Sequence, residues 1–150
     1  MSAPTSSEPS REIVSRRVID APRERVFRAF SDPTRLARWW GPKGFRNTIH
    51  EFDFRPGGTW RLTMHGPDGT DYPNRSVFLT IEEPAGIEFE HESPHGFRMT
   101  ITLGDEGGKT RVGWRMRFES AAEHDRIAPV AVPANEQNFD RLEAELAGHP

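Results

Sequence analysis

Between Phe45 and Phe118 the chain alternates apolar and polar residues in one short run after another. This alternation is typical of strands that have one covered face and one solvated face, as in an antiparallel sheet. Turn sequences such as Pro56-Gly57-Gly58 and Pro84-Ala85-Gly86 separate the runs,. Because the connections are short, we expect consecutive hairpins that form a meander. The covered positions should be Trp60, Leu62 and Met64; Val77, Leu79 and Ile81; Ile87, Phe89 and His91; Phe97, Met99, Ile101 and Leu103; and Val112, Trp114, Met116 and Phe118. This phase leaves Phe78 facing outward.

Different patterns flank the alternating region. Residues 12–20 place apolar residues among charges, which predicts a first strand. Val26, Phe27 and Phe30 then follow helical spacing,. Asp32-Pro33 provides a cap residue and a proline suited to a first helical turn. We therefore expect two short helices that meet at residues 31–32 and end near residue 41.

The last segment returns to helical spacing, with Phe139, Leu142 and Leu146 on one face,. Pro129 and Pro133 should prevent this helix from starting before about residue 133, because proline lacks the N–H group that a helix interior needs. A sheet with one apolar face and a single amphipathic helix can bury both surfaces if the sheet curls around the helix. The sequence thus predicts an α+β helix-grip fold with six to seven antiparallel strands.

Composition excludes several classes of protein. The length of 150 residues suits one domain, which we expect over residues 11–150, after a polar, disordered tail at residues 1–10,. There is no cysteine, and no apolar run approaches the roughly 20 residues of a membrane span,. The net charge of −3 provides no general field for nucleic acid,. With no signal peptide apparent, we expect a cytoplasmic protein.

Several short motifs resemble one known family. They are Ala21-Pro22 through Val26-Phe27, Asp32-Pro33 to Trp39-Trp40-Gly41-Pro42, Asp53-Phe54-Arg55-Pro56-Gly57-Gly58, Met64 through Gly69, and Asp140-Arg141-Leu142. Over residues 12–147 the chain resembles the START/Bet v 1-like (SRPBCC) superfamily, in the branch similar to the C-terminal domain of the activator of Hsp90 ATPase. The resemblance implies a cavity for apolar or amphipathic small molecules between the sheet and the C-terminal helix. It implies no shared catalytic triad or metal site.

The candidate cavity residues are mostly large aromatic and thioether side chains. Aromatic walls are typical of ligand pockets, and methionine suits adaptable binding surfaces. Adjacent Trp39 and Trp40 point in different directions, so one ring could close the mouth of a cavity. The candidates are Trp39, Trp40, Trp60, Met64, Phe89, His91, Met99, Trp114, Met116, Phe139 and Leu142.

Residues 91–95 match the letters of the zinc-protease motif HExxH, but that motif works only on a helix,. Pro94 directly before His95 opposes a helix there, and we expect a strand end that runs into a turn. The basic row of Arg111, Arg115 and Arg117, with Arg98 alongside, is expected on a solvated outer face, where it could also contact an anion or a partner,.

Three functions remain in competition. The first is a protein that holds a hydrophobic or amphipathic small molecule. The second is an interaction module, either a co-chaperone-like stimulator of a chaperone ATPase with a role in stress response or a homodimer. The third is an enzyme acting on a ligand in the same cavity, with His91, His50 or a nearby Glu as base. No nucleophile–base pattern is readable, so we expect a non-enzyme with no cofactor and no metal.

Overall fold

Seven antiparallel strands form a single sheet in the order β1-β7-β6-β5-β4-β3-β2. The computed structural model describes residues 11–93 and 96–148, so the expected tail at residues 1–10 and the turn at residues 94–95 lie outside the described residues. The meander is confirmed, with β1 returning to pair with β7. The strands are β1 (Glu12–Ile19), β2 (Arg46–Phe52), β3 (Thr59–His65), β4 (Asp71–Glu82), β5 (Gly86–Ser93), β6 (Phe97–Glu106) and β7 (Lys109–Phe118).

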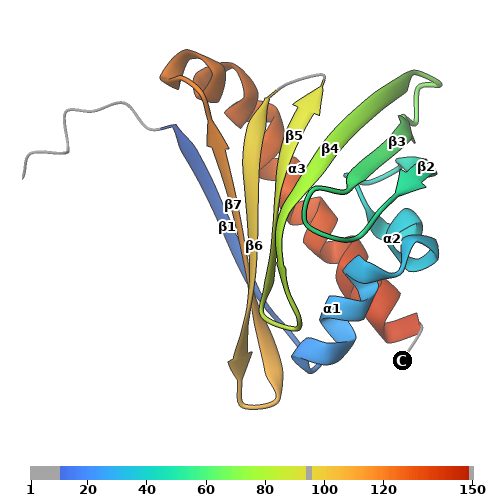
Figure 1. The fold of residues 1–150 in the computed structure, drawn as a ribbon, viewed down its shortest axis with the longest axis vertical. Coiled ribbons are helices and arrows are strands. Elements are labelled where there is room, and N and C mark those ends of the chain that lie inside the picture. Colours follow the sequence, from blue (N-terminus) through green and yellow to red (C-terminus); the bar gives the residue numbers. More distant parts are fainter. Residues whose placement is uncertain (1–10, 94–95, 149–150) are drawn as a thin grey trace, which may run out of the picture.

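Two short helices and one long helix cover the inner face of the curved sheet (Figure 1). Helix α1 spans Arg23–Ser31 and α2 spans Pro33–Trp39, and the two lie near one end of the long helix α3, Ala121–Gly148. The expected junction is confirmed, because Asp32 ends α1 and its side chain accepts a hydrogen bond from the Thr34 N–H at the start of α2 (3.0 Å). The α+β helix-grip fold is therefore as predicted.

The start of α3 is a correction. The helix begins at Ala121, twelve residues before the expected start, and Pro129 and Pro133 lie inside it. The Ser120 hydroxyl accepts a hydrogen bond from the Glu123 N–H and caps the first turn (3.1 Å),. Both prolines lie one turn apart on the exposed side of the helix. There, water can satisfy the carbonyl groups that lose a partner, and the helix accommodates proline by bending.

The inner face of β4 is a second correction. Ser76 and Phe78 are buried, whereas Val77 and Leu79 are only half-buried on the opposite side. The pairing of β4 with β5 shifts between Phe78 and Thr80, so a bulge changes which residues face the core,. Phe78 therefore points inward, not outward as the simple alternation predicted.

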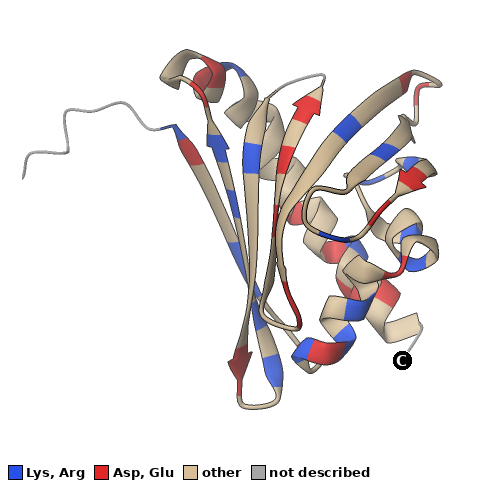
Figure 2. Ribbon diagram, viewed as in Figure 1, with Lys and Arg blue, Asp and Glu red and all other residues tan. Residues whose placement is uncertain are grey.

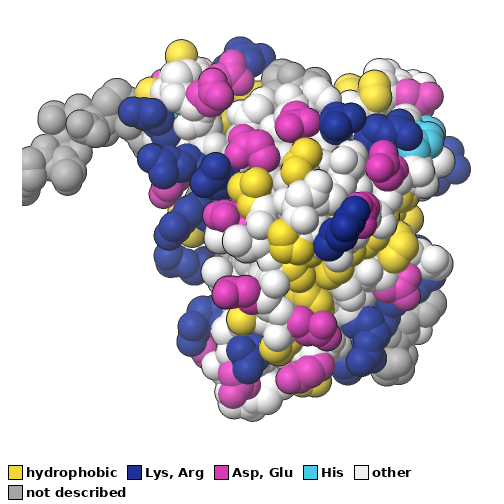
Figure 3. Space-filling model, viewed as in Figure 1, with side chains coloured by type: hydrophobic (Ala, Val, Ile, Leu, Met, Phe, Trp, Pro, Cys, Tyr) yellow, Lys and Arg dark blue, Asp and Glu magenta, His cyan; other side chains and the backbone are white. Residues whose placement is uncertain are grey.

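The outer face of β1, β7 and β6 carries exposed arginines. We call this surface the basic strip, and its residues are Arg16, Arg98, Arg111, Arg115 and Arg117. Figure 2 shows basic residues repeated along β7, and Figure 3 shows Lys and Arg side chains gathered along the same edge. Nearby acidic residues partly neutralise the strip, through ion pairs of Arg98 with Glu90 (3.3 Å) and Arg115 with Glu12 (3.8 Å).

Within the described part of the chain, no helix is long and apolar enough to cross a membrane.

Candidate functional site

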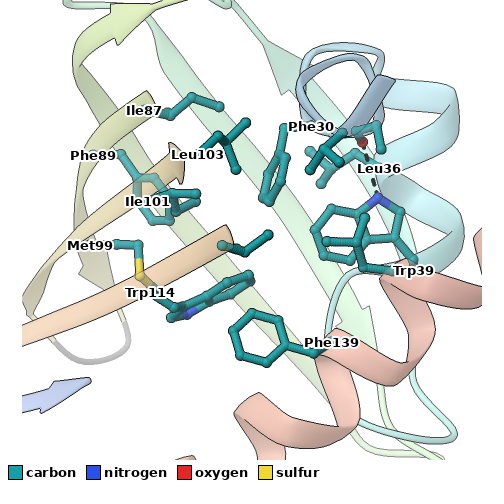
Figure 4. Packing of buried hydrophobic residues seen from close by; sticks show 14 of the residues in the cluster. Phe30, Leu36, Trp39, Ile87, Phe89, Met99, Ile101, Leu103, Trp114 and Phe139 are labelled. Atoms are coloured by element: carbon teal, nitrogen blue, oxygen red, sulfur yellow. Dashed lines mark hydrogen bonds between the residues drawn. The ribbon is translucent and has the colours of Figure 1, made fainter. Parts of the chain in front are cut away.

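A small apolar cavity lies between the inner face of the sheet and helices α1 and α2, and we call it the aromatic cavity. Its volume is about 10 Å³, which is room for about one water molecule,. Figure 4 shows Phe30 and Leu36 of the short helices facing Ile87, Phe89 and Ile101 of the sheet. The full lining is Phe30, Leu36, Trp40, Phe52, Phe54, Trp60, Phe78, Ile87, Phe89 and Ile101.

The half-buried ring of Trp40 connects this cavity to the rest of the aromatic core. Its centroid lies 5.0 Å from that of Trp60 and 5.4 Å from that of Trp114, on which it stacks. Phe89 and Trp39 complete its aromatic contacts, with centroids at 6.4 and 5.6 Å. A single side chain therefore separates two buried indoles from each other and forms one wall of the cavity.

Side chains from β2 and α3 hold the backbone on both sides of Trp40. Asn47 donates to the carbonyl oxygens of Ala37 (3.1 Å) and Trp40 (2.8 Å), and Asn138 of α3 donates to that of Trp39 (2.9 Å). The Trp40 N–H donates to the Leu36 carbonyl oxygen and ends α2. Since these bonds all use backbone groups of the segment, they fix the backbone while leaving the Trp40 ring free of them.

Arg141 of α3 strengthens this attachment. Its guanidinium donates to the carbonyl oxygens of Arg38, Trp40, Gly41 and Pro42, at 2.9 to 3.0 Å. Burial lowers the pKa of Arg141, because desolvation disfavours the charged form of its guanidinium,. The motifs at residues 39–42 and 140–142, on which the family resemblance is based, thus lie in contact in the structure. Together they fix the end of α2.

Trp39 has a different place from its neighbour. Its ring is fully buried, and its indole N–H donates to the Ala29 carbonyl oxygen (3.0 Å; Figure 4). It packs edge-on against Phe30, with centroids 4.8 Å apart. Trp39 therefore connects α1 to α2 within the core, whereas Trp40 reaches the cavity.

The turn after β2 positions another part of the wall of the aromatic cavity, formed by Phe52, Phe54 and Phe78. Gly57 donates to the Phe78 carbonyl oxygen and Phe78 donates to that of Gly58, so the turn is attached directly to β4. A Cβ at Gly58 would lie 1.9 Å from the Asp53 carbonyl oxygen, which explains why glycine occupies this position,. Phe52 and Phe54 stack at 5.4 Å beside this turn, and both meet Phe78 edge-on.

Two buried hydrogen-bond donors are left over in this region. The indole N–H groups of Trp60 and Trp114 reach no acceptor among the residues described, although only 3% and 2% of these residues' surface is exposed. Leaving a buried donor unpaired costs about 1–3 kcal/mol. Trp60 lines the aromatic cavity, whereas Trp114 packs on Phe139 of α3, with centroids 5.2 Å apart.

The residues predicted from the sequence fall into three groups: cavity lining, buried core and core margin. Trp40, Trp60 and Phe89 line the aromatic cavity. Beneath α3, where the sequence predicted a hollow, the buried side chains of Trp114, Phe139 and Leu142 belong to the packed core. Trp39, Met99 and Met116 also belong to the buried core, whereas Met64 packs against it and His91 is half-buried in β5.

Seven lining residues were absent from the sequence-based candidates. Phe52 and Phe54 flank the Arg55-Pro56-Gly57-Gly58 motif, which was the available signal for them. Phe78 was missed because the bulge in β4 reverses its expected direction. The others are Phe30, Leu36, Ile87 and Ile101.

The histidines that the structure describes lie outside the aromatic cavity. His91 is in strand β5, where its ring stacks on Phe97 with centroids 4.5 Å apart, and its Nε2 contacts the Asn74 Oδ1 (2.5 Å). The strand conformation of residues 91–93 excludes the helical arrangement that a zinc-protease motif requires, while His95 lies outside the described residues,.

On the exposed outer side, His65 contacts the Thr48 hydroxyl and the Asp71 carboxylate, both at 2.7 Å. This order resembles a nucleophile–base–acid chain, but the three groups lie on a solvated sheet surface. Residues 11–93 and 96–148 contain no cluster of three or more His, Cys, Asp or Glu side chains suited to a metal ion.

Comparison with known proteins is consistent with this geometry. The family model for "Activator of Hsp90 ATPase homolog 1-like protein" matches residues 20–147. No curated protein matches the chain.

Solved structures with the same fold come from several bacteria. A protein from Arthrobacter aurescens is 26% identical, with a TM-score of 0.85 over 92% of this chain and 87% of that one. One from Chromobacterium violaceum is 26% identical, with a TM-score of 0.78 over 89% and 95% of the two chains. One from Nitrosomonas europaea is 20% identical, with a TM-score of 0.85 over 99% and 100%.

Proposed function

The chain belongs to the Activator of Hsp90 ATPase homolog 1-like family, and from this premise we propose that it binds a hydrophobic or amphipathic small molecule in the aromatic cavity. The observation that carries the proposal is the composition of the cavity wall. All ten lining side chains are apolar, and seven of them are aromatic. Such a wall suits the binding of flat apolar molecules.

Binding requires the cavity to open, because its present volume holds no more than about one water molecule,. Trp40 is the side chain placed to open it. Its ring is half-buried, and the hydrogen bonds of this segment hold its backbone. Rotation of the side chain alone would therefore enlarge the cavity without disturbing α2.

The energetics favour replacing one ring by another. Moving the Trp40 ring into water costs free energy, about 25 cal/mol for each Å² of apolar surface that becomes exposed. A flat ligand that takes its place between Trp60 and the neighbouring rings restores similar contacts. The ligand binds only molecules whose cavity is open. The apparent affinity is therefore lower than the affinity of the open state, in proportion to the fraction of molecules that are open.

Fluorescence of N-phenyl-1-naphthylamine, a neutral probe that brightens in apolar surroundings, tests this proposal. We expect the native protein to bind the probe and naphthalene to displace it. Trp40→Ala should bind the probe about tenfold more tightly, since the closed state is removed. Val130→Ala, on the exposed side of α3, should match the native protein. Failure of both the native protein and Trp40→Ala to bind would refute the proposal.

The basic strip favours a second candidate function, an interaction module that contacts an acidic protein surface, such as that of a chaperone,. Stimulation of ATP hydrolysis by a purified chaperone would support it, provided that Arg115→Glu combined with Arg117→Glu abolishes the effect. The same double variant should leave probe binding unchanged. A homodimer and a cytoplasmic location remain predictions from the sequence.

A further inference from the structure

Trp60 lines the aromatic cavity and carries a hydrogen-bond donor on its indole ring. Its indole N–H is buried and reaches no acceptor within the described ranges. The other rings fix the plane of the indole: Phe78 stacks on it at 6.1 Å, and Phe89 meets it edge-on at 5.4 Å. The direction of the N–H is therefore set before any ligand arrives.

From this donor we infer that the ligand of the aromatic cavity is a flat apolar molecule with a neutral hydrogen-bond acceptor, and that Trp60 Nε1 donates to it. This inference rests on the proposed function and adds the chemical class of the ligand. A hydrogen-bond acceptor on the ligand would remove the free-energy cost of the unpaired donor. Molecules with such an acceptor should therefore bind more tightly than molecules of the same shape without it.

A water molecule is a poor alternative partner for this N–H. A buried water needs two to four polar partners. The polar groups of the lining side chains are the indole N–H groups of Trp60 and of the half-buried Trp40, both donors, and the other lining side chains are hydrocarbon. An acceptor that belongs to an apolar ring system needs no further polar partner, because contacts with the wall stabilise the rest of that molecule.

The acceptor should be uncharged. No arginine, lysine or histidine is among the lining residues, so a carboxylate or phosphate would lose its hydration without gaining a cation,. Burial of such a charge costs far more than one hydrogen bond returns. A carbonyl oxygen, an ether oxygen or a ring nitrogen meets the requirement.

Naphthalene and quinoline form a matched pair of probes, because they have the same shape and differ by one ring nitrogen that accepts a hydrogen bond. We would measure both dissociation constants at neutral pH, where quinoline is uncharged, by NMR titration of protein labelled with ¹⁵N in its indole groups. Trp60→Phe keeps an aromatic ring and removes the donor. We expect it to weaken quinoline binding about fivefold more than naphthalene binding.

Trp114→Phe is the matched control, since it removes an equally buried and unpaired N–H that does not line the cavity. It should leave the ratio of the two affinities unchanged, as should Tyr72→Phe on the exposed surface. In the native protein, quinoline and not naphthalene should move the Trp60 indole N–H proton resonance downfield, which tests the contact even if a variant fails to fold.

The outcomes separate this inference from the proposed function. If both probes bind but Trp60→Phe affects them equally and the Trp60 resonance does not discriminate, the inference is overturned and the proposed function stands. If neither probe binds the native protein or Trp40→Ala, the proposed function fails, and the inference fails with it.

Discussion

Side chains around the end of α2 attach its backbone firmly but form no hydrogen bond with the Trp40 ring among the described contacts. Arg141, Asn47 and Asn138 hold the carbonyl groups at the end of α2, where a helix leaves acceptors unsatisfied,. Trp39 is hydrogen-bonded within the core, whereas Trp40, its neighbour, lies half-buried between other rings. Two adjacent tryptophans therefore have separate purposes, one in folding and one in the candidate site.

Arg141→Met should reduce the free energy of unfolding by about 2–4 kcal/mol, because four carbonyl groups lose a charged donor,. Urea denaturation followed by tryptophan fluorescence would measure the change. Arg61→Met, which breaks an exposed ion pair with Glu51 (3.3 Å), should change stability by less than about 1 kcal/mol,. Equal effects of the two substitutions would show that the attachment of Trp40 does not depend on Arg141.

At the scale of secondary structure, ion pairs attach α3 to its neighbours on two sides. Arg17 of β1 contacts Glu136, Asp140 and Glu143 at 2.6 to 2.9 Å, and these carboxylates raise its pKa despite desolvation. Near the other end, the buried Glu145 carboxylate contacts Arg38 (2.7 Å) and Arg35 (3.3 Å) of α2. The hydrogen bonds that Arg38 donates to Glu145 are the main cause of the raised pKa of Arg38.

Glu145→Gln should destabilise the protein by about 3 kcal/mol, since it removes the charge of a buried carboxylate that two guanidinium groups contact,. Relative to the native protein, the variant should show a larger increase in the hydrogen-exchange rate of amides in α2 than of amides in β6 and β7. Glu143→Gln changes a more exposed carboxylate and serves as the control. An unchanged exchange rate in α2 would mean that the ion pair does not hold α2 against α3.

Local patterns predicted the elements better than their exact limits and faces. The alternation between Phe45 and Phe118 predicted the meander because side-chain direction has a period of two in any strand. The direction of Phe78 could not be predicted, because a single bulge reverses the phase and leaves no clear trace in the sequence,. The early start of α3 was missed because the sequence does not reveal that Pro129 and Pro133 lie on the exposed side of the helix, where water can satisfy the carbonyl groups that lose a partner,.

Considered as a whole, the molecule is a curved sheet whose concave side is shared by three helices. The sequence predicted that α3 would cover a hollow, but Phe139, Leu142 and Trp114 pack together beneath it. The aromatic cavity lies instead beneath α1 and α2. Its location and its volume of about 10 Å³ depend on how side chains from five strands and two helices pack, which no local pattern contains,.

A crystal structure of the protein with naphthalene bound tests the central claim most directly. The account predicts naphthalene beside Trp60 and Phe78, with the Trp40 ring turned outward and the backbone of residues 37–42 unmoved. Naphthalene found only on the outer surface of the sheet, with the Trp40 ring still stacked on Trp114, would contradict it.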